Sequence, residues 1–224
     1  MEQFDEEDVM YCIFHLPRCG SHYVHSLLKT SLALGNAIHL SDEDEPFNPA
    51  YNTLEQVHEK YQKMIARTPR PVVKMVINHY PWLAEKFLED EMYTTIFIEP
   101  KNYRTRLLKA LVEKQLSTFS NGTDRKNSRE RFLGQLEFTE DKIVERLEHY
   151  QSHMMYRDRC DVVVLDEDVF QHPDQLMKQL NLEYVGAKYK RKAPYHSDEA
   201  MLKDVNQFNE MYEQLSMKII GKVL

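Results

Sequence analysis

Residues 16–22 place a proline, an arginine, a glycine and a serine in one short turn, a combination that suits the binding of phosphate or sulfate. Gly20 permits a backbone conformation that other residues resist, and it lets an anion approach the chain closely. Arg18 adds a fixed positive charge with forked donors. Ser21 can cap a helix that begins here, or it can donate to a ligand oxygen. The turn therefore predicts an anion site, and the alternative is an ordinary strand-to-helix turn with Ser21 as its cap.

The elements on either side of the turn would position it for this role. An apolar, β-rich run predicts a strand at residues 9–15, and apolar side chains at helical spacing predict a helix at residues 22–34. The backbone amides and the dipole at the N-terminus of such a helix favour a negative group. The phosphate loop of nucleoside triphosphatases needs a lysine directly after its last glycine, and no lysine follows Gly20. A kinase is therefore the weakest of the functions that an anion site allows.

Strand and helix signals alternate along the whole chain. Short apolar runs predict further strands at residues 72–77, 93–98 and 161–165. Helical periodicity predicts helices at residues 53–67, 81–90, 102–118, 139–158, 173–180 and 198–220. This alternation predicts a three-layer α/β fold, in which a mostly parallel sheet carries helices on both faces. We expect one domain over residues 1–224, with a helical insertion at about 119–158 and loops at 41–49 and 120–128.

Composition argues against several classes of protein. The chain has 224 residues, a formal net charge of −7 and a sequence pI of about 5.8, which argues against general nucleic-acid binding. The acidic N-terminus lacks the features of a signal peptide, and no apolar run reaches membrane-spanning length. Cys12, Cys19 and Cys160 are far apart and form neither a metal-binding spacing nor a disulfide framework. These features predict a cytoplasmic protein without a structural metal.

Residues 13–24 resemble the 5′-phosphosulfate loop of the sulfotransferases that use 3′-phosphoadenosine 5′-phosphosulfate (PAPS). That family has a strand followed by P-[KR]-[ST]-G-[ST]-x-[WYFL], and Cys19 stands here in place of the small hydroxyl residue. The resemblance implies a P-loop NTPase-like sulfotransferase fold with PAPS as the sulfuryl donor. It also implies that the 5′-phosphosulfate of the donor is held by Arg18, Cys19, Gly20, Ser21, His22 and Tyr23.

A second segment, residues 71–81, resembles the family's strand that carries the catalytic base, written K-T-H-x-P. His79 is the candidate base, because histidine can take a proton from an acceptor hydroxyl near neutral pH. His79 lies three residues farther from Lys74 than the family's spacing. The alternative is that His79 only ends a strand and that Lys74 is an inward or edge charge with no catalytic task. The resemblance gives a second catalytic role to Arg18, which would stabilise charge on the transferring group.

The family's site for the 3′-phosphate of the donor is only partly matched. Residues 96–109 show the strand-then-helix pattern, but its arginine and its serine are absent. Lys101, Arg104 or Lys109 would supply charge in their place. The alternative is that these are solvent-facing charges on an amphipathic helix, which is what we expect for Arg106.

Two later segments also follow the family's order. Residues 161–170 resemble the pattern v-l-x-Y-E-D-L, in which Glu167 matches a glutamate that we interpret as structural. The densest basic cluster of the chain follows at residues 188–192. In several sulfotransferases a basic loop closes over the 3′-phosphate at this place, which implies donor binding by Lys190 and Arg191. The alternative is a solvated loop.

The leading hypothesis is a sulfotransferase that transfers a sulfuryl group from PAPS to a hydroxyl or amine acceptor, without a metal. The alternative is a protein that kept the fold, lost the chemistry and serves as a structural or binding subunit of an assembly. The absent arginine and serine motivate this alternative. An apolar stripe on the C-terminal helix would then meet a partner or a second copy, although such stripes more often pack in a core. The stripe comprises Phe208, Met211, Tyr212, Leu215, Ile219 and Ile220.

Overall fold

The computed structural model describes residues 10–17, 19–32, 46–47, 49, 52–66, 72–119, 129–186 and 197–221. The chain divides into two compact units, which we describe separately. The sheet unit comprises Met1–Lys101 and Met155–Arg191, and the helical unit comprises Asn102–Met154 and Lys192–Leu224. The single domain with an insertion at about 119–158 stays a prediction, and so do the loops, which fall largely outside the described residues.

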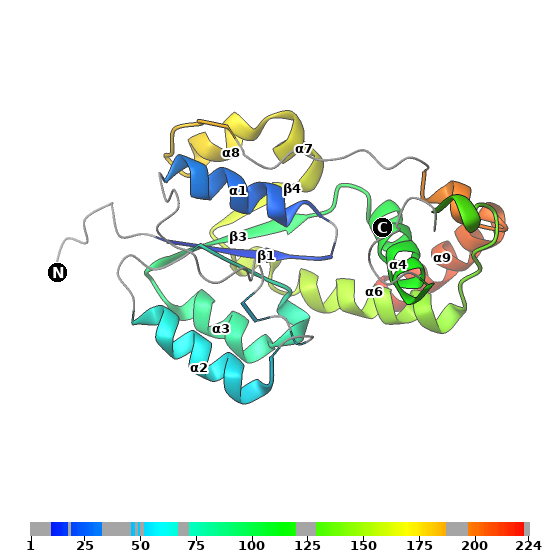
Figure 1. The fold of residues 1–224 in the computed structure, drawn as a ribbon, viewed down its shortest axis with the longest axis horizontal. Coiled ribbons are helices and arrows are strands. Elements are labelled where there is room, and N and C mark those ends of the chain that lie inside the picture. Colours follow the sequence, from blue (N-terminus) through cyan, green and yellow to red (C-terminus); the bar gives the residue numbers. More distant parts are fainter. Residues whose placement is uncertain are drawn as a thin grey trace. The chain divides into compact units, whose positions relative to one another are not determined.

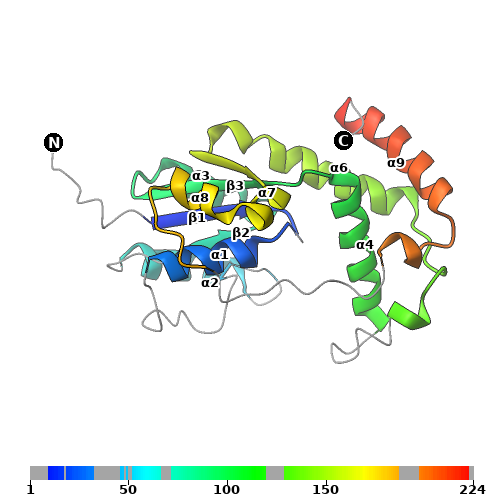
Figure 2. The same cartoon turned by 90° about the horizontal axis from the view of Figure 1, so that it is seen from above.

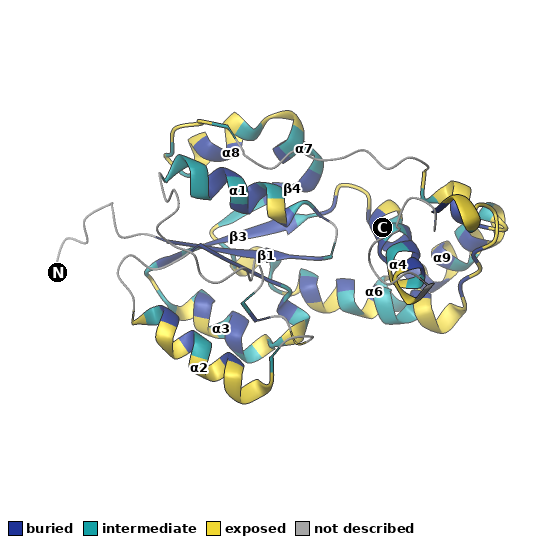
Figure 3. Ribbon diagram, in the orientation of Figure 1, coloured by how far each residue is buried: buried dark blue, intermediate teal, exposed yellow. Residues whose placement is uncertain are grey.

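The sheet unit contains four parallel strands in the order β2-β1-β3-β4. Their bounds are Met10–His15 for β1, Val73–Met75 for β2, Tyr93–Glu99 for β3 and Val162–Leu165 for β4. All six residues of β1 are buried, as a near-continuous apolar run in the middle of a parallel sheet requires (Figure 3). The predicted α/β class with a parallel sheet is confirmed.

Helices cover both faces of the sheet (Figure 1). One face carries α1 (Ser21–Ser31), α7 (Asp166–Gln171) and α8 (Pro173–Gln179), and Figure 2 views the unit from this face. The opposite face carries α2 (Leu54–Ile65) and α3 (Pro81–Glu89). The core of the first face joins strand residues such as Ile13 and Ile96 to Leu27 of α1 and Leu176 of α8. The arrangement fits the predicted three layers.

An aromatic cluster forms the core of the opposite face. The ring of Phe87 is fully buried on α3, and its centroid lies 4.9 Å from that of Tyr93, 5.7 Å from that of Tyr61 and 6.1 Å from that of Phe47. Trp82, the single tryptophan of the chain, lies at the edge of the same cluster, 6.4 Å from Tyr61. The α2–α3 layer is therefore held on the sheet mainly by buried aromatic surface.

The helical unit is built from α4 (Tyr103–Phe119), α6 (Glu140–Met154) and α9 (Val205–Ile220). The apolar stripe of α9 packs inward, with Phe208, Tyr212 and Leu215 buried. The prediction that this stripe belongs to a core is confirmed for those three residues. A buried ion pair also ties the unit together, because the Arg129 guanidinium lies 2.9 Å from Glu113 and 2.7 Å from Asp198.

Three expectations need correction. The strand predicted at 72–77 ends at Met75, because the chain turns into a 3-10 helix at Ile77–His79. The helix α7 was not predicted, and it starts directly after β4 with three acidic residues in its first turn, where the helix dipole favours them. Arg106 does not face solvent, since only 5% of it is exposed.

We predict that Phe87→Ala lowers the free energy of unfolding of the sheet unit by about 3–5 kcal/mol, because it leaves a cavity in the aromatic cluster. Leu54→Ala is the matched control, since Leu54 is 56% exposed on α2, and its cost should stay within about 0.5 kcal/mol. Urea unfolding followed by the fluorescence of Trp82 measures both variants. Equal midpoints for the two variants would contradict this assignment of the core.

Candidate functional site

The candidate site lies at the carboxyl ends of the parallel strands. The chain leaves β1 toward β2 on one side and later returns to place β3 on the other side of β1. Ligands of open α/β sheets bind at such a switch point. The turn after β1 and residues 100–101 after β3 both lie at this edge, because β1 and β3 are parallel with His15 opposite Ile98. The predicted anion turn therefore lies at the topological switch point of the sheet.

The backbone of the turn is held by the carbonyl of Leu16. The thiol of Cys19 donates to this oxygen over 2.9 Å, the backbone N–H of Cys19 donates to it over 3.4 Å, and Nδ1 of His15 lies 3.0 Å from it. Cys19 thus performs a structural task that a hydroxyl residue can also perform. Arg18 lies outside the described residues, so its predicted roles stay predictions.

Gly20, and not Ser21, occupies the N-cap of α1. Gly20 has a left-handed backbone with φ of 86°, and its carbonyl accepts from the N–H of Tyr23 over 2.8 Å. Ser21 is the first helical residue and is buried. The N–H of Tyr23 is used in this cap, and the start of α1 directs the positive end of the helix dipole at the turn.

Phe170 of α7 covers the glycine. A Cβ atom at Gly20 would stand 2.5 Å from Cζ of Phe170, closer than atoms can approach. The rings of Phe170 and Tyr23 lie 4.9 Å apart, and burial, followed by the nearby Tyr184, raises the pKa of Tyr23. The turn is thus packed between α1 and α7, a contact that the sequence did not indicate because α7 was not predicted.

A buried lysine lies beside the first turn of α1. Lys74 is the central residue of β2, and none of it is exposed. Its register opposite Ile13 places it on the α1 face of the sheet. Its Nζ lies 2.8 Å from Nδ1 and 3.0 Å from Nε2 of His22. The amine of Lys74 is therefore held against the first turn of α1, next to the predicted anion turn.

Lys74 belongs to the candidate site, although no ligand-binding role was predicted for it from the sequence. The position of Lys74 inside an apolar strand could have indicated a special role, because lysine is almost never buried unless it is paired. Only the register and the helix layer show which face of the sheet it occupies.

The ends of β3 and β4 carry mainly acidic groups. Oε2 of Glu99, at the end of β3, accepts from Nε of Arg157 over 2.9 Å, and this hydrogen bond raises the pKa of Arg157. The buried Asp166 accepts from the backbone N–H of Lys101 over 3.1 Å. The ammonium of Lys101 lies 3.9 Å from Glu167 and 3.7 Å from Asp168. Lys101, predicted to meet a 3′-phosphate, thus already has two carboxylate neighbours.

His79 lies at the same edge of the sheet as the turn. It ends the 3-10 helix that follows β2, it is exposed, and its backbone N–H donates to Val76 over 3.1 Å. Because β2 and β1 are parallel with Met75 opposite Phe14, His79 follows its strand as the turn follows β1. An exposed imidazole at this edge can accept a proton from a group bound beside it.

The remaining predicted site residues fall elsewhere. Lys109 and Arg104 lie on α4 of the helical unit, where Arg104 binds Asn209 and lies 2.7 Å from Glu199. Lys190 and Arg191 lie outside the described residues. The structure therefore brings together at one edge of the sheet Cys19, Gly20, Ser21, His22, Tyr23, Lys74, His79 and Lys101.

The described ranges contain neither a candidate metal site nor a candidate membrane-spanning helix. No group of three or more histidine, cysteine, aspartate or glutamate residues there is placed to hold a metal ion. Among those same residues, no helix is long and apolar enough to cross a membrane. Cys12, Cys19 and Cys160 carry thiols and form no disulfide.

Comparison with known proteins does not identify a family. No family model matches the chain, and no curated protein matches it. The resemblance to sulfotransferases therefore stays a prediction that depends on the turn and the order of the later segments.

We predict that Gly20→Ala destabilises the sheet unit by about 2–5 kcal/mol, from a left-handed alanine and the clash with Phe170 together. Gly134→Ala is the matched control, because Gly134 also has a positive φ but has no atom within 4 Å of a Cβ. It should show only the backbone cost of about 1–2 kcal/mol. Thermal unfolding compares the two variants. If Phe170→Leu does not relieve part of the Gly20→Ala loss, the packing argument is wrong.

Proposed function

We propose that the protein is a sulfotransferase that transfers a sulfuryl group from PAPS to a hydroxyl or amine acceptor. The observation that carries the proposal is the placement of the buried Lys74 beside the first turn of α1, at the switch point of a parallel sheet. Lys74 puts a second kind of anion-binding group next to the helix N-terminus. The sulfotransferase-like sequence of the turn is what favours a phosphosulfate over other anions.

Each chain group in the proposal has a defined task. The acceptor oxygen or nitrogen attacks sulfur, the bond from sulfur to the bridging oxygen breaks, and 3′,5′-bisphosphoadenosine leaves. Negative charge grows on that bridging oxygen, where the turn amides, Arg18 and Lys74 would stabilise it. His79 would accept the proton that the acceptor loses. These groups are fixed by β1, β2 and α1 before a ligand binds, except Arg18, which lies outside the described residues.

A second candidate is a nucleotide-binding or structural protein of the same fold without transfer activity. The observation that favours it is the acidic character of the β3–β4 end, where Glu99 contacts Arg157 and Lys101 lies near Glu167 and Asp168. A donor with a 3′-phosphate at this end would have to displace one of these contacts. Catalysis of sulfuryl transfer would distinguish the two candidates.

We predict that 3′,5′-bisphosphoadenosine binds the full chain more tightly than adenosine 5′-phosphate, as measured by isothermal titration calorimetry. Lys74→Met or Arg18→Ala should each weaken this binding by about 1.5–3 kcal/mol, the value of a hydrogen bond to a charged group. Lys86→Met is the matched control, because Lys86 is an exposed lysine of α3. Absence of binding at millimolar ligand would overturn the proposal.

We predict that His79→Ala lowers kcat by about 10²–10⁴-fold without changing the affinity for 3′,5′-bisphosphoadenosine, because a general base acts on the acceptor and not on the donor. The assay measures the transfer of the radiolabelled sulfuryl group from PAPS to each member of a panel of phenols, alcohols and amines. His58→Ala, at an exposed histidine of α2, serves as the control. Unchanged turnover in the His79 variant would remove His79 as the base.

A further inference from the structure

The outer edge of β4 is the second feature of the sheet unit that suits a ligand. β4 is the last strand in the order β2-β1-β3-β4, and no strand of the described residues pairs with its outer side. Its four residues are Val162, Val163, Val164 and Leu165. Edge strands are protected from pairing by short length, a lysine, a proline, a bulge or a covering segment. Val162–Leu165 is four residues long and contains no lysine or proline.

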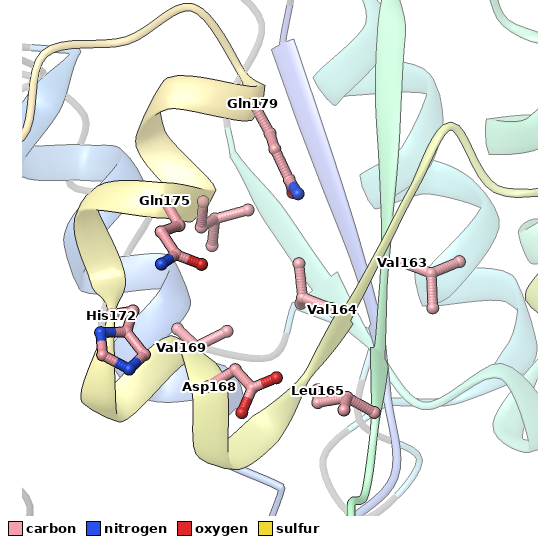
Figure 4. Close-up of a pocket in the computed structure, with 9 residues that line it drawn as sticks. Val163, Val164, Leu165, Asp168, Val169, His172, Gln175 and Gln179 are labelled. Carbon is pink, nitrogen blue, oxygen red and sulfur yellow. The ribbon is translucent and has the colours of Figure 1, made fainter.

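A pocket of about 160 Å³ lies beside this edge, between β4 and the two helices α7 and α8 (Figure 4). Val164, Val169 and Leu176 supply apolar surface, while Asp168, Gln175 and Gln179 supply polar groups. In Figure 4 the side chains of Asp168 and Gln179 project from the helices toward β4. The pocket therefore borders β4 along Val163–Leu165, and side chains of α7 and α8 form its other side.

The charge at the pocket is negative. Asp168 is the carboxylate among the residues that line it, and the imidazole of His172 is the other titratable group there. The ammonium of Lys101 lies 3.7 Å from Asp168 and 3.9 Å from Glu167, so one positive charge is shared by two carboxylates. The three groups together keep one negative charge. A cationic side chain entering the pocket would meet this charge and the amide oxygens of Gln175 and Gln179.

We propose that the outer edge of β4 and this pocket bind an extended peptide segment that carries a lysine or an arginine. The segment would add to the sheet as a further strand, so that its backbone hydrogen bonds supply affinity and the pocket selects one side chain. The methylene groups of that side chain would lie on Val164 and Leu176, and its charged end would reach Asp168. The inference shares the Lys101–Asp168 contact with the place where a donor 3′-phosphate would bind, but it does not depend on sulfuryl transfer.

The test uses the full chain and five fluorescein-labelled, end-blocked hexapeptides of alternating threonine and valine. One central residue is lysine, arginine, glutamine, leucine or glutamate, and fluorescence anisotropy gives the affinity of each peptide. The lysine and arginine peptides should bind at least 10-fold more tightly than the glutamate and leucine peptides. Equal affinity for all five peptides, or no binding at 1 mM, would overturn the proposal.

Three further measurements separate the parts of the proposal. Asp168→Asn should remove the preference for lysine, whereas Glu167→Gln, at a neighbouring acid that does not line the pocket, should keep most of it. A lysine peptide with alternate backbone nitrogens methylated should lose at least 10-fold in affinity, because it cannot complete a strand pair. Equal binding of the methylated peptide would refute strand addition. A dimer in sedimentation that Val163→Lys dissociates would show that a second copy occupies the edge, which also overturns the proposal.

Discussion

The candidate site depends on the close contact between the backbone of Gly20 and the ring of Phe170. The chain must leave β1, reverse and begin α1 at a residue with a φ of 86°, and the same residue must leave no side chain in the space that Phe170 fills. Both conditions select glycine. Because Phe170 belongs to α7, which follows β4 directly, the contact fixes the start of α1 against the far end of the sheet. The position of the turn amides therefore depends on packing across the whole layer of helices.

The second constraint is the burial of Lys74. Removing an ammonium group from water costs several kcal/mol unless the surroundings compensate it. The structure places this group against His22, which belongs to the first turn of α1. A cation held in this way requires little reorganisation when an anion binds, because the charge is already oriented by β2 and α1.

The sequence predicted the parts of the fold that follow from local patterns. The apolar runs of β1, β3 and β4 gave strands within one residue of their observed bounds, because buried parallel strands need nearly continuous apolar residues. The features that failed depend on tertiary contacts. The six residues of α7 are too few for helical periodicity, and the burial of Arg106 follows from the packing of the helical unit. For the site, the glycine turn was visible in the sequence, whereas the role of Lys74 needed the register of β2 with β1.

The carboxyl ends of β1 and β2 carry groups that favour an anion, whereas the carboxyl ends of β3 and β4 carry mainly acidic groups. This contrast bears on the choice between an enzyme and a binding protein. At the β1–β2 end, Lys74 and the start of α1 favour an anion. At the β3–β4 end, Glu99 ends β3, Asp166 follows β4, and Lys101 has two carboxylate neighbours. One phosphate group would thus be stabilised at the first end, while a second one at the other end would have to draw Lys101 away from Glu167 and Asp168. Since exposed ion pairs of this length contribute at most about 1 kcal/mol, a 3′-phosphate can make that exchange with a net gain. The acidic end would therefore lower the affinity for a doubly phosphorylated donor without preventing its binding, so it does not conflict with the proposed transfer from PAPS.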